Sequence, residues 1–218
     1  MTFTVLARDP RDGLIGAATA SRSLAVGAGV TAVDPGVGVV ASQAWTNRAL
    51  RGLLLAAMRE GRSAADAVAA TPGWDDGHAL RQVAALGWSG AGAARSGADI
   101  TAWAGDLVTP DAVFIGNFLA GPDVLAAMAA AWRTDGRDLA DRLIDVLAAG
   151  ERAGGDARGR QSAALVLASR ADIVLDLRVD DHPDPISELA RLRRLAAGAG
   201  IPAEMPTSPI SAQAPTAS

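Results

Sequence analysis

The sequence predicts an α+β protein in which two antiparallel sheets are faced by layers of helices. The expected elements come in groups: strands, two helices, strands, two helices, strands and a final helix. This grouping fits antiparallel sheets covered by helices better than the strand–helix–strand repeat of a parallel sheet. Half of the 218 residues are hydrophobic and few are aromatic, so the apolar content suits close packing of flat layers. A chain of this length can bury one substantial core.

The chain opens with a predicted β-hairpin. Residues 2–7 are rich in β-formers, residues 9–13 (DPRDG) form a turn signal, and residues 14–20 provide the return strand. Residues 27–38 are rich in glycine and contain the turn Asp-Pro-Gly. A buried strand is expected next, at 37–43.

Helical periodicity then alternates with further strands. Asn47 is expected to be the N-cap of the next helix. The predicted helices are 47–59, 63–70, 122–133, 137–153 and 185–197. The predicted strands are 81–88, 91–95, 99–104, 112–118, 162–168 and 172–179. Residues 1–200 are expected to form a single domain, followed by a disordered Pro/Ser/Thr/Ala tail at 203–218.

Composition excludes several kinds of chemistry. The chain has no Cys and no Lys, so disulfides, thiolate metal sites, a Cys nucleophile and a Lys base are all excluded.

A net charge of −4 without a basic stretch predicts no nucleic-acid partner. The apolar runs are too short for a membrane span, and Arg8 and Asp9 interrupt the place of a signal peptide. We therefore expect a cytoplasmic protein. Its Gly-x-Gly patterns lack dinucleotide-binding spacing, and we predict no cofactor.

Thr2 is the first candidate for a nucleophile. Methionine is normally removed when a small residue follows it, so we expect the mature chain to begin at Thr2. A free α-amino group titrates near neutral pH and could serve as the base for the threonine hydroxyl. Nucleophile and base would then lie on one residue. The alternative is that Thr2 is simply a small second residue.

Several segments resemble a family of bacterial proteins of unknown function. They are TFTVLARDPRDGLIGAATASRSLAVGAGV, GVGVVASQAWTN, AWAG, GNFLAGPDV, AGGDARGRQSAAL and DLRVDDHPDP. Over residues 2–195 the chain resembles the domain-of-unknown-function 1028 (DUF1028) family, which is placed in the N-terminal nucleophile hydrolase superfamily. The resemblance implies a four-layer αββα sandwich and, by analogy, hydrolysis of amide bonds. It implies no particular substrate. Two positions depart from the family pattern: Arg22 replaces a Lys, and Ile115 replaces a Gln.

Three polar residues end apolar strands where they could meet Thr2. Ser21, Gln43 and Asn117 each occupy such a position. Uncharged donors suit an oxyanion hole because they stabilise negative charge without titrating. We take Gln43 and Asn117 as catalytic candidates with Thr2, and Ser21 as a substrate-binding candidate. The alternative is that all three only satisfy the ends of strands.

The block at 154–162 (GGDARGRQS) crowds polar groups between a helix end and a strand. An arginine from this block, or Arg22, could hold a substrate carboxylate. The alternative is a buried pair of Asp156 with an arginine that fixes the loop. The substrate-binding candidates are Ser21, Arg22, Asp156, Arg158, Gln161 and Ser162.

Residues 180–185 (DDHPDP) invite a metal hypothesis, since His182 lies among carboxylates. Adjacent residues cannot all face one ion and no second His lies near, so we predict no metal site. The preferred interpretation is a turn into the last helix, with Pro185 in its first turn.

The leading hypothesis is an N-terminal-threonine amidohydrolase without metal or cofactor. Its substrate would be a small amide, an N-acyl or N-carbamoyl amino acid, or a short peptide. The alternative is a binding or assembly protein that keeps the fold without activity, and a metal hydrolase ranks third. A homo-oligomer is expected in either leading case, because flat layers rich in Ala and Gly pack readily on copies of themselves.

Overall fold

Two antiparallel sheets lie face to face in this computed structural model, which describes residues 2–101, 103–134 and 137–198. The larger sheet has six strands in the order β10-β9-β2-β1-β8-β7, and the smaller has four in the order β3-β4-β5-β6. The larger sheet consists of β1 (Thr2–Asp9), β2 (Leu14–Ser21), β7 (Ala104–Val108), β8 (Ala112–Asn117), β9 (Ser162–Ala168) and β10 (Ile173–Val179). The smaller consists of β3 (Thr31–Asp34), β4 (Gly38–Ala44), β5 (Arg81–Gly87) and β6 (Ala93–Ser96).

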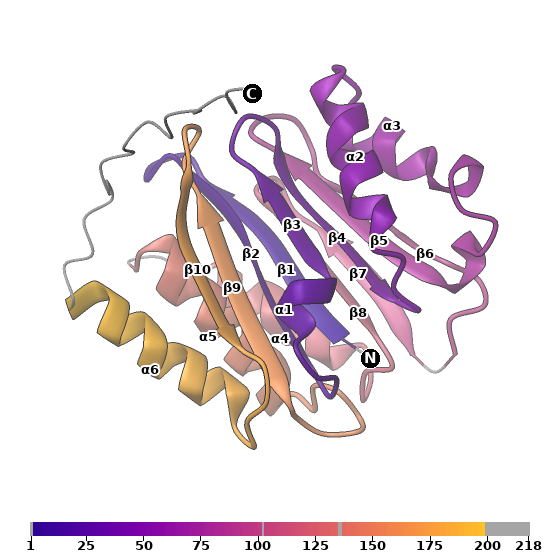
Figure 1. Ribbon diagram of the computed structural model, residues 1–218. Coiled ribbons are helices and arrows are strands. Elements are labelled where there is room, and N and C mark those ends of the chain that lie inside the picture. The colour runs from indigo at the N-terminus through magenta and orange to yellow at the C-terminus, as the bar shows by residue number, and fades with distance from the viewer. Residues whose placement is uncertain (1, 102, 135–136, 199–218) are drawn as a thin grey trace, which may run out of the picture.

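Helices cover the outer face of each sheet (Figure 1). The larger sheet carries α4 (Asp123–Trp132), α5 (Leu139–Arg152) and α6 (Pro185–Gly198), and the smaller carries α2 (Ala49–Arg59) and α3 (Ala64–Ala69). Short elements fill the connections: α1 (Val26–Gly29) and the 3-10 turns η1 (Thr71–Gly73) and η2 (His78–Leu80). The predicted α+β sandwich of two antiparallel sheets is confirmed.

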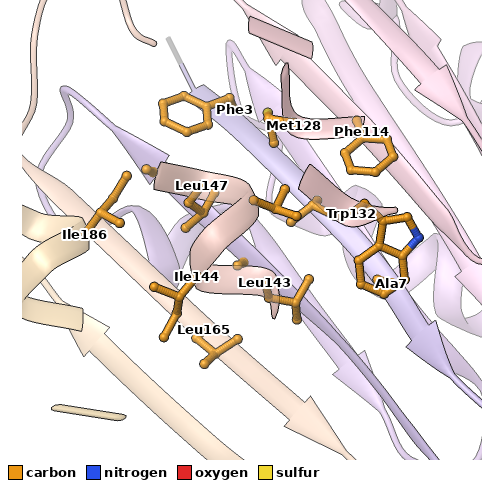
Figure 2. Packing of buried hydrophobic residues seen from close by; sticks show 14 of the residues in the cluster. Phe3, Ala7, Phe114, Met128, Trp132, Leu143, Ile144, Leu147, Leu165 and Ile186 are labelled. Carbon is orange, nitrogen blue, oxygen red and sulfur yellow. The ribbon is translucent and has the colours of Figure 1, made fainter. Parts of the chain in front are cut away.

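Three apolar clusters hold these layers together. The largest lies between the six-stranded sheet and its helices, where Phe3, Phe114, Met128 and Leu147 pack together (Figure 2). A second cluster fills the space between the sheets, and a third lies under α2 and α3. All eight residues of β1 are buried, because this central strand is covered on both faces.

Alternation along β1 decides which side chains enter which cluster. Phe3 and Val5 point toward the helices, whereas Leu6 belongs to the cluster between the sheets. Side chains alternate between the two faces of a strand. Thr2 and Thr4 therefore share the face of Leu6 and point toward the second sheet.

Most predicted elements are present, with shifts at three places. First, residues 27–38 were expected only to be a glycine-rich segment with a turn. This region contains α1 and β3, and its turn joins β3 to β4. The strand predicted at 99–104 lies instead at β7. The turn at 109–111 connects β7 to β8 and sets their register, so residues 104–108 form the strand that pairs with β8. Asn47 is not the N-cap, but its Oδ1 accepts a hydrogen bond from the N–H of Ala49 at 3.0 Å.

Two further sequence expectations concern the ends of the chain and membranes. The tail predicted at 203–218 lies outside the described residues. Within the described part of the chain, none of the helices combines the length and apolar character needed to span a bilayer.

Candidate functional site

A row of polar side chains crosses one end of the six-stranded sheet. Thr2 is the register partner of Asn117 on β8, and Ser21 is that of Ser162 on β9. The Thr2 hydroxyl donates a hydrogen bond to the Ser21 hydroxyl at 3.3 Å. Register partners in an antiparallel sheet point to the same face. The four residues therefore form one row, and each is at most 5% exposed.

This row faces the second sheet. Thr4 shares the face of Thr2, and its hydroxyl donates to Gln43 Oε1 on β4 at 2.7 Å. The Gln43 amide nitrogen donates to the backbone carbonyl of Thr2 at 3.2 Å. Thr4 also lies 2.8 Å from the hydroxyl of Thr19, measured between the two oxygens. The structure thus brings together Thr2, Ser21, Gln43 and Asn117, as expected from the ends of their strands.

Gln82 on β5 connects these groups and was missed by sequence reasoning. Its amide oxygen accepts hydrogen bonds from Gln43 at 2.8 Å and from Asn117 at 3.0 Å. Its amide nitrogen donates to the backbone carbonyls of Gly105 and Gly116 at 3.1 and 2.9 Å, and to a serine hydroxyl on β6. The available signal was a glutamine at the start of an apolar strand, since a fully buried amide needs partners.

Strained backbone follows two of the site residues. Ala44 (φ 69°) directly follows Gln43, and Phe118 (φ 54°) directly follows Asn117. In the described chain, only one more non-glycine residue has a positive φ, Ala25 at 52°. The left-handed conformation costs a side-chain-bearing residue about 1 kcal/mol or more, and such strain concentrates at functional sites. The sharp turns end β4 and β8 immediately after the two amides.

The loop from 154 to 162 is fixed mainly by Asp156. This buried carboxylate accepts hydrogen bonds from the backbone N–H groups of Arg22 and Arg158, at 2.8 and 2.9 Å. The guanidinium of Arg158 also lies 3.1 Å from it. These contacts match the alternative in which an Asp–Arg pair fixes the loop.

Ser162 is likewise engaged with the backbone. Its hydroxyl donates to the carbonyl of Ser23 and accepts from the N–H of Val26 at 3.1 Å. It therefore holds the segment that leads into α1, although it lies in the same row as Thr2. The side chains of Asp156 and Ser162 are thus both engaged in hydrogen bonds with the protein backbone.

Two other candidates lie at the rim of the site. The exposed guanidinium of Arg22 donates to Gln161 Oε1 at 2.7 Å, and Gln161 in turn donates to Asp181 at 3.2 Å. Arg158 is 44% exposed. Both guanidinium groups are therefore accessible to solvent, and Gln161 holds that of Arg22.

A cavity of about 100 Å³ lies beside the row, on the helix side of β1. Its lining includes Phe3, Ser21, Gly155, Glu151 and Arg160. The Glu151 carboxylate lies 3.3 Å from the Arg160 guanidinium. Burial raises the pKa of Glu151, and the neighbouring guanidinium opposes that rise. Ser21 is the residue that belongs both to the lining of this cavity and to the row that contains Thr2.

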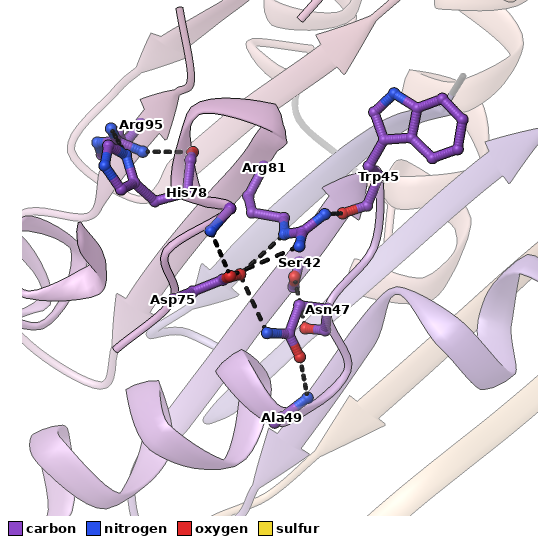
Figure 3. Close-up of polar contacts among 9 residues, drawn as sticks. Ser42, Trp45, Asn47, Ala49, Asp75, His78, Arg81 and Arg95 are labelled. Carbon is purple, nitrogen blue, oxygen red and sulfur yellow. Dashed lines mark hydrogen bonds and ion pairs between the residues drawn. The ribbon is translucent and has the colours of Figure 1, made fainter. Parts of the chain in front are cut away.

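The segment after Gln43 is braced by Asp75 (Figure 3). The Asp75 carboxylate accepts hydrogen bonds from Arg81 at 2.8 Å and Asn47 at 3.0 Å. Arg81 also donates to the backbone carbonyl of Trp45 at 2.7 Å. The Arg81 and Asn47 hydrogen bonds lower the pKa of Asp75 from 3.8 to about 2. This brace fixes the turn that carries Trp45, whose ring is largely exposed.

The segment around His182 forms a turn into α6. Its Nδ1 accepts a hydrogen bond from the N–H of Asp184 at 3.0 Å, and Pro185 begins the helix. Across the residues that the structure describes, no three His, Cys, Asp or Glu side chains are grouped so that they could hold a metal ion. The turn-and-helix interpretation of 180–185 is the one that fits this geometry.

Comparison with known proteins places the chain in a family. The model of the "Family of unknown function (DUF1028)" matches residues 2–189. A crystal structure of the protein SPO2555 from Silicibacter pomeroyi, of the same family, superposes with a TM-score of 0.83 at 34% sequence identity. The match covers 90% of this chain and 89% of that one. No curated protein matches. The chain therefore belongs to the DUF1028 family of unknown function.

Proposed function

We propose that the chain is an N-terminal-threonine amidohydrolase of the N-terminal nucleophile hydrolase superfamily. The observation that carries this proposal is the hydrogen bond from Thr2 Oγ1 to Ser21, at the start of the central strand and within a buried set of uncharged amides. The chain has neither Cys nor Lys. The Thr2 hydroxyl and its own α-amino group would thus provide a nucleophile and a base without a Cys or a Lys.

The reaction would proceed in two steps. Thr2 Oγ1 attacks the amide carbonyl carbon while the α-amino group takes the hydroxyl proton and then gives it to the leaving amine. Water next hydrolyses the resulting ester and restores the hydroxyl. Backbone N–H groups would hold the oxyanion. The amide nitrogens of Gln43 and Asn117 already donate within the network, so we assign this role to the backbone, and these two side chains would position Thr2.

The proposed substrate is a small amide, an N-acyl or N-carbamoyl amino acid, or a short peptide. Arg22 and Arg158 at the rim would bind its carboxylate, because a guanidinium matches the planar carboxylate group. We further propose a cytoplasmic homo-oligomer.

The test is the intact mass of the purified protein before and after treatment with a β-lactone probe. Loss of Met1 and a single adduct are expected, and Thr2→Ala should abolish the adduct. Thr31→Ala, which removes another buried threonine hydroxyl, is the matched control and should keep it. Retention of Met1 would remove the proposed base and refute the mechanism.

The second candidate function is a binding or assembly protein that keeps this fold without activity. The burial of the site favours it: Thr2 is 5% exposed, and Gln43 and Asn117 are fully buried. This candidate predicts that the β-lactone forms no adduct with the folded protein. The same mass measurement therefore separates the two functions.

A further inference from the structure

One acceptor in the buried network is left without a donor. Asn117 is fully buried, and within the described part of the chain its Oδ1 has no hydrogen-bond partner. Buried polar atoms are almost always paired. This amide oxygen belongs to the residue opposite Thr2 in the β1–β8 pair. It is therefore suited to accept a hydrogen bond from a donor that is present in the active protein.

The backbone determines which way the amides point. Gln82 places one end of its amide against the carbonyls of Gly105 and Gly116. Carbonyls only accept, so this end must be the nitrogen and the other must be the oxygen. That oxygen lies against both Gln43 and Asn117, so each of them must turn its nitrogen toward Gln82.

Of the two remaining oxygens, that of Gln43 meets Thr4, and that of Asn117 belongs to the residue opposite Thr2 in the register. Gln43 Oε1 accepts the hydroxyl proton of Thr4. Asn117 Oδ1 has no such donor in the described chain. Because the direction of this amide follows from two backbone carbonyls, the free end of Asn117 presents an acceptor and not a donor.

The backbone nitrogen of Thr2 points toward the same strand as this acceptor. The N–H of Arg8 donates to the carbonyl of Asp111 on the segment entering β8. Along the same antiparallel register, hydrogen-bonding positions recur every second residue, and Thr2 lies six residues before Arg8 opposite Asn117. The nitrogen of Thr2 is thus directed at the main-chain carbonyl of its register partner, Asn117. A free α-amino group carries further hydrogens, and the Oδ1 of the same residue can accept one of them.

We propose that Asn117 Oδ1 binds the α-amino group of Thr2 once Met1 has been removed. This inference rests on the proposed function and deepens it. The hydrogen bond holds the base beside its own hydroxyl, and it favours the ammonium form, which raises the pKa of the amine. Gln82 acts as the positioning residue, because it fixes the direction of the Asn117 amide.

The chain offers a direct way to test this hydrogen bond. It contains no Lys, so the α-amino group is the only aliphatic amine of the protein. In protein labelled with nitrogen-15 threonine, the Thr2 amine gives one resonance apart from the amides, and its titration gives the pKa. Asn117→Leu should lower this pKa by about one unit, a tenfold change in proton affinity. Asn117→Asp should raise it.

Thr19→Val is the matched control, because it removes a fully buried hydroxyl from the same network. It should leave the pKa of the amine unchanged. If Asn117→Leu does not fold, the rise in Asn117→Asp decides the question. An unchanged pKa in the Asn117 variants, or an equal shift in Thr19→Val, would overturn the inference and assign Oδ1 to a substrate N–H. Retention of Met1 would show no amine resonance from Thr2, which is a failure of the proposed function instead.

Discussion

The Thr2 hydroxyl donates a hydrogen bond to the Ser21 hydroxyl at 3.3 Å across the β1–β2 pair. Both side chains are buried, and Ser21 also lines the cavity that contains Glu151 and Arg160. This contact gives the threonine oxygen a defined direction. It also joins Thr2 to the rest of the polar row at this end of the sheet.

Ser21→Ala should weaken the reaction of Thr2 with the β-lactone probe. The substitution removes the acceptor that orients the nucleophile, and a hydrogen bond of about 1 kcal/mol corresponds to a loss of roughly five- to tenfold in rate. The measurement is the rate of adduct formation by intact mass. Ser162→Ala is the matched control, because that hydroxyl binds the backbone of Ser23 and Val26. It should lower stability and leave the rate unchanged; a similar rate loss in both variants would contradict the prediction.

Gln82→Leu should destabilise the protein by at least about 3 kcal/mol, because it leaves several buried donors and acceptors unpaired at roughly 1–3 kcal/mol each. They belong to Gln43, Asn117 and two backbone carbonyls. The free energy of unfolding in urea gives the loss. Gln161→Leu, at a rim glutamine, should change stability by less than about 1 kcal/mol. An equal loss in the two variants would argue against a central role for Gln82.

Much of the site could be predicted because its members lie at the ends of apolar strands: Thr2 begins β1, whereas Ser21 and Asn117 end β2 and β8. Thr2, Ser21 and Asn117 lie on strands that pair side by side, so polarity at a strand end was sufficient to bring them together. Gln82 also lies near the start of an apolar strand, but this signal alone did not reveal its part in the network. Its hydrogen-bond partners lie in both sheets. Its role therefore depends on how the two sheets pack against each other, which involves residues that are far apart in the sequence.

The roles of the loop residues were harder to predict than their positions. A buried aspartate beside arginines fits both a substrate site and an internal brace, and the difference lies in which backbone N–H groups it meets. For Asp156 these come from Arg22, far away in sequence, and from Arg158. The strand β3 was missed for a related reason, since glycine-rich sequence conceals a strand that is defined by pairing with β4.

Asp75 should make the protein lose stability as the solution becomes acidic. Hydrogen bonds from Arg81 and Asn47 lower its pKa to about 2 from 3.8. A carboxyl with a depressed pKa contributes stability above its unfolded pKa, and this contribution is lost as the pH falls from about 4 to about 2. The contribution near neutral pH is about 2 kcal/mol, and Asp75→Asn should remove it.

The measurement is the difference in free energy of unfolding between wild type and variant as a function of pH. The difference should be largest at pH 7 and shrink below pH 4. Asp76→Asn makes the same chemical change in the same loop and should cost less than about 0.5 kcal/mol. A difference for Asp75→Asn that does not vary with pH would assign the effect to packing.

Glu151→Gln should stabilise the protein at neutral pH. Burial raises the pKa of this carboxyl despite the guanidinium of Arg160 at 3.3 Å. Because the folded state binds the proton more tightly than the unfolded chain, the free energy of unfolding falls as the pH rises above the unfolded pKa, near 4.5. Glutamine does not ionise and so avoids this loss.

The variant should therefore gain stability over wild type at pH 7, and the gain should disappear below pH 4.5. Glu188→Gln provides the opposite case, since its hydrogen bonds with Arg191 lower the pKa of Glu188. That variant should be slightly less stable than wild type at pH 7. Urea unfolding at the two pH values gives both differences. A loss of stability in Glu151→Gln at pH 7 would mean that the ion pair with Arg160 outweighs the cost of burying the carboxylate.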